Sequence, residues 1–167
     1  MQRFFPELNS SFSTLEFLCG VIWPGRKVPA MKGYDVFLSH RGIDTRRTVT
    51  VLLHDRLAGL GLRPFLDCKS MVPGDRLFER IDSAVLECRL GVAILSPRYC
   101  DSYHCLHELA LMMESKKKVI PIFCDVKPSE LHVSDSVICS SNEAQRFNAA
   151  LEEARNIVGI PFNSANE

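Results

Sequence analysis

The sequence LGVAIL at residues 90–95 decides the fold, because it is apolar throughout. A strand without polar alternation is typical of a parallel sheet that is covered by helices on both faces. Amphipathic segments separate it from similar runs, so strand and helix patterns alternate from Tyr34 onward. This alternation predicts a doubly wound α/β domain with about five parallel strands. The other expected strands are Val36–Leu38, Leu62–Leu66, Val119–Cys124 and a stub at Ile160–Phe162.

Pro64 indicates that the strand Leu62–Leu66 lies at an edge of the sheet, because proline cannot donate to a neighbouring strand. An edge position for the second strand favours the flavodoxin-like order 2-1-3-4-5. Pro121 is in tension with an interior position for Val119–Cys124. Leu131–Asn142 reads as a loop, and Asp67–Asp75 as a loop of nine residues.

Four helices are expected between the strands. The last two of these are predicted at about Tyr99–Ser115 and from Glu143 to about Val158, where apolar residues recur at helical spacing. The earlier two carry their core faces on Val49, Leu52, Leu53, Leu57 and Leu60, and on Leu77, Ile81, Ala84, Val85 and Cys88.

Composition narrows the class of protein. Lys+Arg and Asp+Glu both number 20, so the zero formal charge lacks the basic footprint of a nucleic-acid binder. The seven cysteines include no CxxC pair, which favours neither a disulfide framework nor a zinc site and fits a reducing cytoplasm or nucleus. No apolar run approaches the roughly 20 residues that span a membrane. We expect a flexible extension at residues 1–32, one domain at 33–162 and a tail at 163–167.

Doubly wound sheets bind ligands beyond the carboxyl ends of their strands, at the point where the strand order reverses. Here the loops at that point are His40–Thr45 and Ser96–Ser102, and the helix that carries Glu108 starts from the second loop. Glu108 is one acid in a mostly apolar helix, with core positions at Leu106, Leu109, Ala110 and Met113. It could act on a developing positive charge. The alternative is a solvated glutamate paired with His104, which lies four residues earlier on the same face.

The segment Arg41-Gly42-Ile43-Asp44-Thr45 could hold a phosphate through backbone N–H groups and Arg41. The alternative is an ordinary turn in which Asp44 or Thr45 caps the next helix. Pro73-Gly74 is either a simple turn or part of a mobile contact loop. The sequence does not exclude a Ser-His-Asp or Cys-His arrangement for nucleophilic catalysis. However, the motif GxSxG is absent, and no partner base is evident for Cys100 or Cys105.

These pieces, in order, resemble the Toll/interleukin-1 receptor (TIR) domain of plant immune proteins. The resemblance is strong over about residues 33–129, and the absence of a nucleotide-binding or leucine-rich-repeat segment suggests a TIR-only protein. The matching segments are YDVFLSHRGIDTR at 34–46, FLD at 65–67, LSPRYC at 95–100, CLHEL at 105–109 and VIPIFCDVKPS at 119–129.

The resemblance implies an NAD+-cleaving enzyme that uses NAD+ as its substrate and needs no cofactor or metal. It assigns catalysis to Glu108 and substrate contacts to His104 and to the segment Arg41, Gly42, Ile43, Asp44, Thr45 and Arg46. It also implies that the loop containing Gly74 completes the site between neighbouring TIR domains. His104 stands where the family usually has Trp, and Val51-Leu52 stand where many relatives have a Ser-His pair that supports dimerisation.

Three functions remain open from the sequence. The first is the NAD+-cleaving enzyme, whose product would be ADP-ribose or a cyclic isomer. The second is a non-catalytic module that signals by assembling with other TIR domains, which the His104 departure favours. The third is an assembly that acts on nucleic acid, which the neutral charge disfavours.

Overall fold

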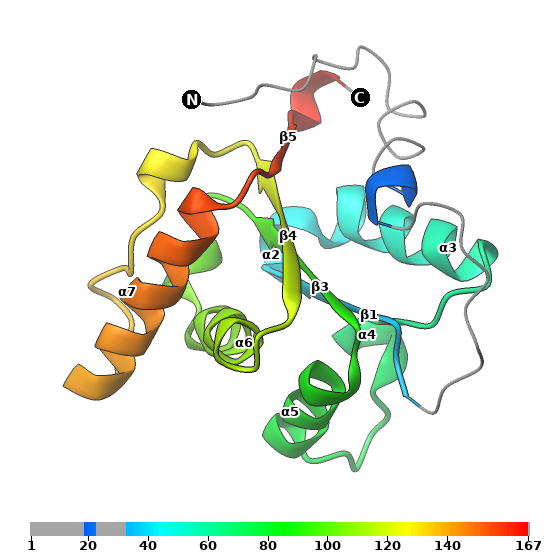
Figure 1. Cartoon of the computed structure of the whole chain (residues 1–167), viewed down its shortest axis with the longest axis horizontal. Coiled ribbons are helices and arrows are strands. Elements are labelled where there is room, and N and C mark those ends of the chain that lie inside the picture. Colours follow the sequence, from blue (N-terminus) through cyan, green and yellow to red (C-terminus); the bar gives the residue numbers. More distant parts are fainter. Residues whose placement is uncertain (1–18, 23–32, 167) are drawn as a thin grey trace.

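The computed structural model describes residues 19–22 and 33–166 of the chain. Its centre is a five-stranded parallel sheet in the order β2-β1-β3-β4-β5, which confirms the predicted flavodoxin-like arrangement (Figure 1). The strand LGVAIL lies in the middle of the sheet and is buried along its whole length. The strands are β1 (Val36–His40), β2 (Pro64–Phe65), β3 (Leu90–Leu95), β4 (Lys118–Cys124) and β5 (Ile160–Phe162).

The helices fall in the connections between the strands. Short helical segments are α2 (Gly42–Thr45), η1 (Arg46–Thr50), α4 (Asp67–Ser70), η2 (Tyr99–Asp101), η3 (Pro128–Glu130) and η4 (Ser164–Asn166). The longer helices are α3 (Val51–Gly59), α5 (Leu77–Glu87), α6 (Tyr103–Glu114) and α7 (Ser141–Asn156).

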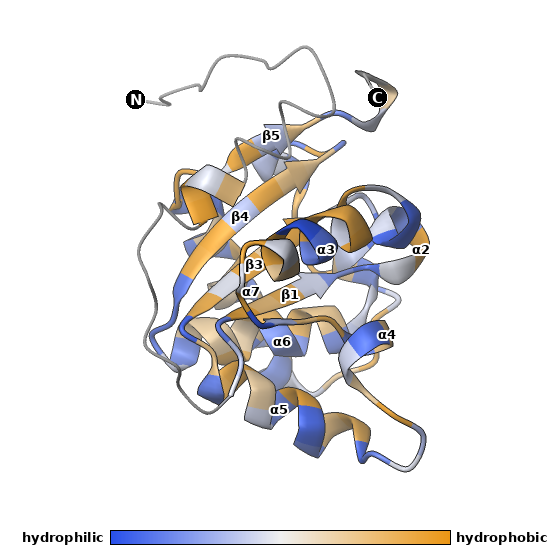
Figure 2. Ribbon diagram, turned by 90° about the vertical axis from the view of Figure 1, so that its right-hand side faces the viewer, coloured by the Kyte–Doolittle hydropathy of each residue, from blue (hydrophilic) through white to orange (hydrophobic). Residues whose placement is uncertain are grey.

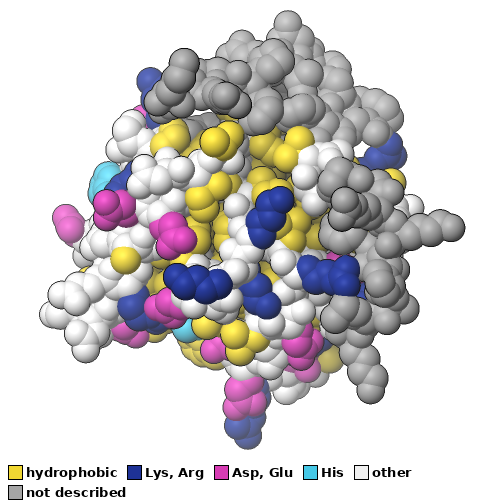
Figure 3. Space-filling view, viewed as in Figure 1, with side chains coloured by type: hydrophobic (Ala, Val, Ile, Leu, Met, Phe, Trp, Pro, Cys, Tyr) yellow, Lys and Arg dark blue, Asp and Glu magenta, His cyan; other side chains and the backbone are white. Residues whose placement is uncertain are grey.

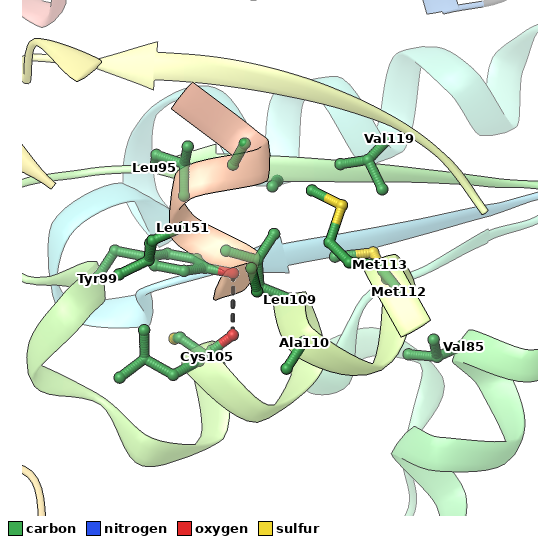
Figure 4. Packing of buried hydrophobic residues seen from close by; sticks show 14 of the residues in the cluster. Val85, Leu95, Tyr99, Cys105, Leu109, Ala110, Met112, Met113, Val119 and Leu151 are labelled. Carbon is green, nitrogen blue, oxygen red and sulfur yellow. Dashed lines mark hydrogen bonds between the residues drawn. The ribbon is translucent and has the colours of Figure 1, made fainter. Parts of the chain in front are cut away.

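Helices cover both faces of the sheet, as an apolar parallel sheet requires. On one face, α5, α6 and α7 pack against side chains that include Phe37, Ala93 and Leu95. Figure 4 shows part of this core around α6. On the other face, α3 packs against alternate residues of the same strands, such as Leu38 and Ile94. The hydropathy colouring of Figure 2 shows apolar strands running between the helices.

The two prolines of the sheet are accommodated in different ways. Pro64 lies in β2, which pairs only with β1 and is therefore the predicted edge strand. Pro121 lies inside β4 and pairs with Ala93 of β3. The pairing of β4 with β5 begins only at Ile122, so no strand of the sheet stands beside Pro121 on that side. This resolves the expected tension.

Two residues that were expected on the core face of the first helix are exposed instead. Leu52 and Leu60 are 47% and 57% exposed. The buried side of α3 is formed by Leu53 and Leu57, next to Val49 of η1, and Leu60 follows the end of the helix. The chain before α3 is also kinked at Thr48 (φ −115°, ψ −110°), which interrupts the helical spacing.

The segments around the site also differ from expectation. Asp67–Asp75 is not wholly loop, because its first four residues form α4. The helix expected over about Tyr99–Ser115 is divided, because Ser102 is extended and its hydroxyl caps α6 by accepting from Cys105 N at 3.3 Å. Leu77, assigned to the core, is 45% exposed.

Most of the proposed extension 1–32 lies outside the described residues. Residues 19–22 form a helical turn in which Cys19 and Ile22 are both 3% exposed. These two side chains belong to the same apolar cluster as Leu53 and Leu57 of α3. This turn therefore extends the layer that covers the α3 face of the sheet.

We predict that Gly159→Ala destabilises the domain. A Cβ atom there would lie 2.8 Å from the backbone oxygen of Pro121 and would collide with the ring of Phe123. Overpacking of this kind costs about 1–3 kcal/mol, which urea denaturation measures. The control is Gly59→Ala at the end of α3, where no atom lies within 4 Å. Equal stability of the two variants would contradict the close approach.

Candidate functional site

A pocket of about 650 Å³ opens beyond the carboxyl end of β1. This size is typical of sites for small organic ligands. Its walls come from β1 and the segment after it, from α4, from α5 and from the start of α6. The lining residues are His40, Arg41, Gly42, Ile43, Asp44, Arg46, Arg47, Asp67, Leu77, Ile81, Ser102, His104, Cys105 and Glu108.

Glu108 is the buried acid of this pocket. It is 9% exposed, and its Oε2 accepts a hydrogen bond of 2.6 Å from the hydroxyl of Ser39 on β1. The alternative of a solvated glutamate paired with His104 is therefore wrong. His104 is exposed and instead stacks on Phe78 of α5, with ring centroids 5.0 Å apart. Glu108 and His104 both line the pocket, and Phe78 packs on the ring of His104.

Burial raises the pKa of Glu108 from an ordinary value of 4.5 to about 8. The hydrogen bond from Ser39 acts in the opposite direction, because a donor favours the charged form. The carboxylates of Asp67 and Asp82 add to the rise by repulsion. A strongly perturbed acid inside a pocket is a common mark of a functional site.

Asp44 joins the segment after β1 to the loop after β3. Its carboxylate accepts from the Ser96 hydroxyl at 2.7 Å, from Arg98 N at 2.8 Å and from Arg98 Nε at 2.6 Å. Although burial acts to raise it, these bonds hold the pKa of Asp44 below its ordinary value. The expected capping by Asp44 or Thr45 is wrong, since α2 and η1 begin without a side-chain cap. Thr45 instead accepts from the Thr50 hydroxyl.

His40 at the end of β1 and Arg41 after it line the pocket and carry buried nitrogen atoms. His40 is 7% exposed, and its Nε2 and the Nε of Arg41 are buried without a hydrogen-bond partner among the described residues. Burial lowers the pKa of His40, with Asp67 opposing the change. At Gly42, a Cβ atom would lie 2.8 Å from Nη2 of Arg46, so glycine leaves room for this guanidinium to fold over the turn.

The structure brings together seven of the nine predicted site residues: Arg41, Gly42, Ile43, Asp44, Arg46, His104 and Glu108. Thr45 is fully buried behind the turn, and Gly74 lies in the loop before α5 without lining the pocket of this chain. Ser39 and Asp67 were missed as site residues. Ser39 lies near the carboxyl end of β1, and Asp67 follows β2. Because ligand sites in such sheets form at the carboxyl ends of the strands, both residues could have been predicted from the sequence.

Within residues 19–22 and 33–166, no cluster of three or more His, Cys, Asp or Glu could hold a metal ion. None of the helices described is both long and apolar enough to cross a membrane.

A parallel sheet in this order, with a buried acid beyond its switch point, defines a flavodoxin-like domain with a ligand crevice. The family model of the TIR domain matches residues 33–165, and the chain belongs to this family. The chain is 31% identical to the TIR domains of the activated Roq1 resistosome, with a TM-score of 0.67, covering 77% of this chain and 87% of that one.

Two curated relatives place the chain among plant proteins. It is 57% identical over 136 residues to the probable 2' cyclic ADP-D-ribose synthase BdTIR of Brachypodium distachyon, covering 79% of this chain and 61% of that protein. It is 35% identical over 142 residues to the TMV resistance protein N of Nicotiana glutinosa, covering 75% of this chain and 12% of that protein. The chain thus spans less than two thirds of the length of both relatives.

We predict that Glu108→Gln raises the stability of the domain, and more so as the pH rises. A raised folded-state pKa means that the folded protein keeps a proton that the unfolded chain loses. The resulting penalty is absent below pH 4.5, grows up to about pH 8 and is then constant. Glutamine removes this penalty, which has an upper bound on the order of 4–5 kcal/mol.

Melting temperatures of the two proteins between pH 4.5 and 8.5 measure this difference, because all other titrations cancel. The control is Glu114→Gln on the same helix, whose carboxylate pairs with Arg146 and whose pKa is lowered by that hydrogen bond. It should show no gain that grows with pH. A stability difference for Glu108→Gln that stays flat across this range would contradict the buried, protonated acid.

Proposed function

We propose that the chain is an NAD+ hydrolase that releases nicotinamide and either ADP-ribose or a cyclic ADP-ribose isomer as a signal in plant immunity, acting in the cytoplasm or nucleus. The observation that carries this proposal is Glu108, a buried carboxyl group inside a pocket of about 650 Å³. The printed name of the Brachypodium relative, a cyclic ADP-ribose synthase, points to the same chemistry.

In this proposal, basic, aromatic and acidic side chains each hold a different part of the substrate. The guanidinium groups of Arg41, Arg46 and Arg47 line the pocket and suit the two phosphates of a dinucleotide. The ring of His104, which lines the pocket and is backed by Phe78, suits an aromatic base, although an imidazole offers a smaller surface than the indole usual in the family. Glu108 and Asp67 suit the ribose hydroxyls between them.

In the proposed reaction, the bond between the ribose C1 and the nicotinamide nitrogen breaks. Its electron pair leaves with nicotinamide, which becomes neutral, and a ribosyl cation of oxocarbenium character remains. The carboxylate of Glu108 stabilises this positive charge and orients the ribose hydroxyls. Capture by water with loss of a proton gives ADP-ribose, whereas capture by a hydroxyl of the same molecule gives a cyclic isomer. Exclusion of water favours the second product.

The second candidate is a non-catalytic module that assembles with other TIR domains. The apolar side chains of Val72, Leu77 and Phe78 favour it, being 65%, 45% and 45% exposed close to the loop that contains Gly74. For an assembly on nucleic acid, the surface offers less support. Figure 3 shows basic and acidic side chains interspersed over one face, without a continuous basic stripe.

We predict that Glu108→Ala lowers the rate of nicotinamide release at least ~100-fold, because the charge-stabilising group is lost. The rate is measured with purified protein and NAD+ by chromatography, and the same assay identifies the product by mass spectrometry. Glu114→Ala is the matched control on the outer face of α6 and should retain normal turnover. Near-normal turnover by Glu108→Ala would contradict the catalytic role of Glu108. An unaltered protein that releases no nicotinamide would favour the non-catalytic interaction module.

We also predict that specific activity rises with protein concentration, because a neighbouring domain's loop around Gly74 completes the site. Gly74 has a φ of +102°, which an L side chain resists, so Gly74→Ala should distort this loop and lower activity. Gly61→Ala is the matched control, since Gly61 also has a positive φ (+84°) and open space around it, but lies at the opposite end of β2. Constant specific activity over a hundredfold dilution of monomeric protein would exclude the composite site.

A further inference from the structure

A chain of hydrogen bonds runs from Glu108 into the core. The Ser39 hydroxyl oxygen lies 2.6 Å from Oε2 of Glu108 and 2.7 Å from the hydroxyl oxygen of Tyr99. The Tyr99 hydroxyl in turn donates to the carbonyl oxygen of Cys105 at 3.0 Å, the bond drawn in Figure 4. Ser39 and Tyr99 are both 0% exposed, so bulk solvent does not reach either hydroxyl.

The number of protons in this chain depends on the state of Glu108. The carbonyl of Cys105 has no proton, so the contact with it uses the proton of Tyr99. The contact between Tyr99 and Ser39 then uses the proton of Ser39. Ser39 donates to Glu108 when the latter is a carboxylate. Once the proton of Ser39 is used toward Tyr99, the contact between Ser39 and Glu108 is a hydrogen bond only if the carboxyl group carries a proton and donates it to the Ser39 oxygen. All three contacts are therefore hydrogen bonds at once only when Glu108 is a carboxylic acid. When Glu108 is a carboxylate, two protons serve three contacts.

We infer that Tyr99 is a positioning residue that acts through Ser39: by accepting the Ser39 proton it keeps that proton from Glu108 and holds Glu108 as an uncharged acid while the site is empty. An incomplete buried hydrogen bond is costly, so the chain resists ionisation of the carboxyl group. The inference concerns the state of Glu108 and rests on the proposed function only for its effect on catalysis. There, the carboxylate forms when a positively charged ring enters the pocket, and the proton goes to solvent.

The charges around Glu108 act in both directions. Asp67 of α4 and Asp82 of α5 oppose its ionisation by repulsion. The arginine side chains at positions 41, 46 and 47 line the same pocket and favour ionisation, as would a protonated His40. Cys105 of α6 stays a thiol, because burial raises its pKa to about 12. Burial likewise raises the pKa of Tyr99 well above its ordinary value, so its proton stays in the chain.

Two substitutions separate this chain from simple burial, because they move the titration of Glu108 in opposite directions. Tyr99→Phe keeps the packing of the ring but leaves the Ser39 proton with no acceptor other than Glu108, which favours the carboxylate. Ser39→Ala removes the donor to the carboxylate and favours the acid. Burial alone gives no reason for Tyr99→Phe to lower the titration point, since that substitution adds no water and no charge.

The test is the titration of the Glu108 carboxyl carbon, followed by NMR in full-length protein made with glutamate labelled with carbon-13 at the side-chain carboxyl. The signal is assigned by its loss in Glu108→Gln. We expect a midpoint near pH 8 in the unaltered protein. It should fall by about one pH unit in Tyr99→Phe and rise by about as much in Ser39→Ala. The rising limb of kcat/KM for nicotinamide release should move with it, because kcat/KM reports the free enzyme.

A midpoint near 4.5 in the unaltered protein, or shifts of both variants in one direction, would overturn the inference. Melting curves confirm that each variant is folded, and either variant alone still tests the sign of its own shift. Opposite shifts in a protein that never cleaves NAD+ would uphold the chain and overturn only the proposed function. Cleavage with pH profiles that do not move in the variants would uphold the function and overturn the inference.

Discussion

The hydrogen bond between Ser39 and Glu108 is the interaction on which the site depends. It connects the end of β1 to α6, across the boundary between the sheet and the helices of one face. Without a polar partner, a carboxyl group at this depth would be expensive to bury. Because Ser39 is fixed by the pairing of β1 with β3, opposite Ala93, the position of the acid is set by the register of the sheet.

Much of the fold follows from the sequence, because long-range order in a parallel sheet leaves local marks. The six apolar residues of β3 predict its central place, and Pro64 predicts the edge. The kink at Thr48 and the helical turn of α4 were not predictable, since both arise from the way the chain after a strand meets neighbouring elements. The helix α6 begins after Ser102 because the Ser102 hydroxyl accepts a hydrogen bond from Cys105 N, a cap that only the structure shows.

The site was predictable in its place and less so in its details. Periodicity placed Leu106, Leu109 and Met113 in the core but left out Cys105 and Met112, which are also buried. Since these two flank Glu108 at helical spacing, a full count of apolar positions in α6 would have predicted a buried acid. The partner of that acid comes from a residue 69 positions away, and no local pattern reveals such a contact. Asp44 lines the pocket as predicted for a site residue, and the bonds of its carboxylate to Ser96 and Arg98 are likewise contacts that no local pattern reveals.

The bonds of Asp44 have a mechanical consequence. They tie the segment after β1 to the loop after β3, and these bonds would have to break for the crevice to widen between the two strands. The start of α6, which follows the loop after β3, forms a second wall, and α4 and α5 form a third. The last two follow the edge strand β2, which has a neighbouring strand on one side only. The pocket would therefore open by movement of α4 and α5 away from the segment that Asp44 ties to the loop after β3. In such an opening, the tied segments would set the shape that a ligand must match, and the movement of α4 and α5 would set the rate at which the ligand enters and leaves.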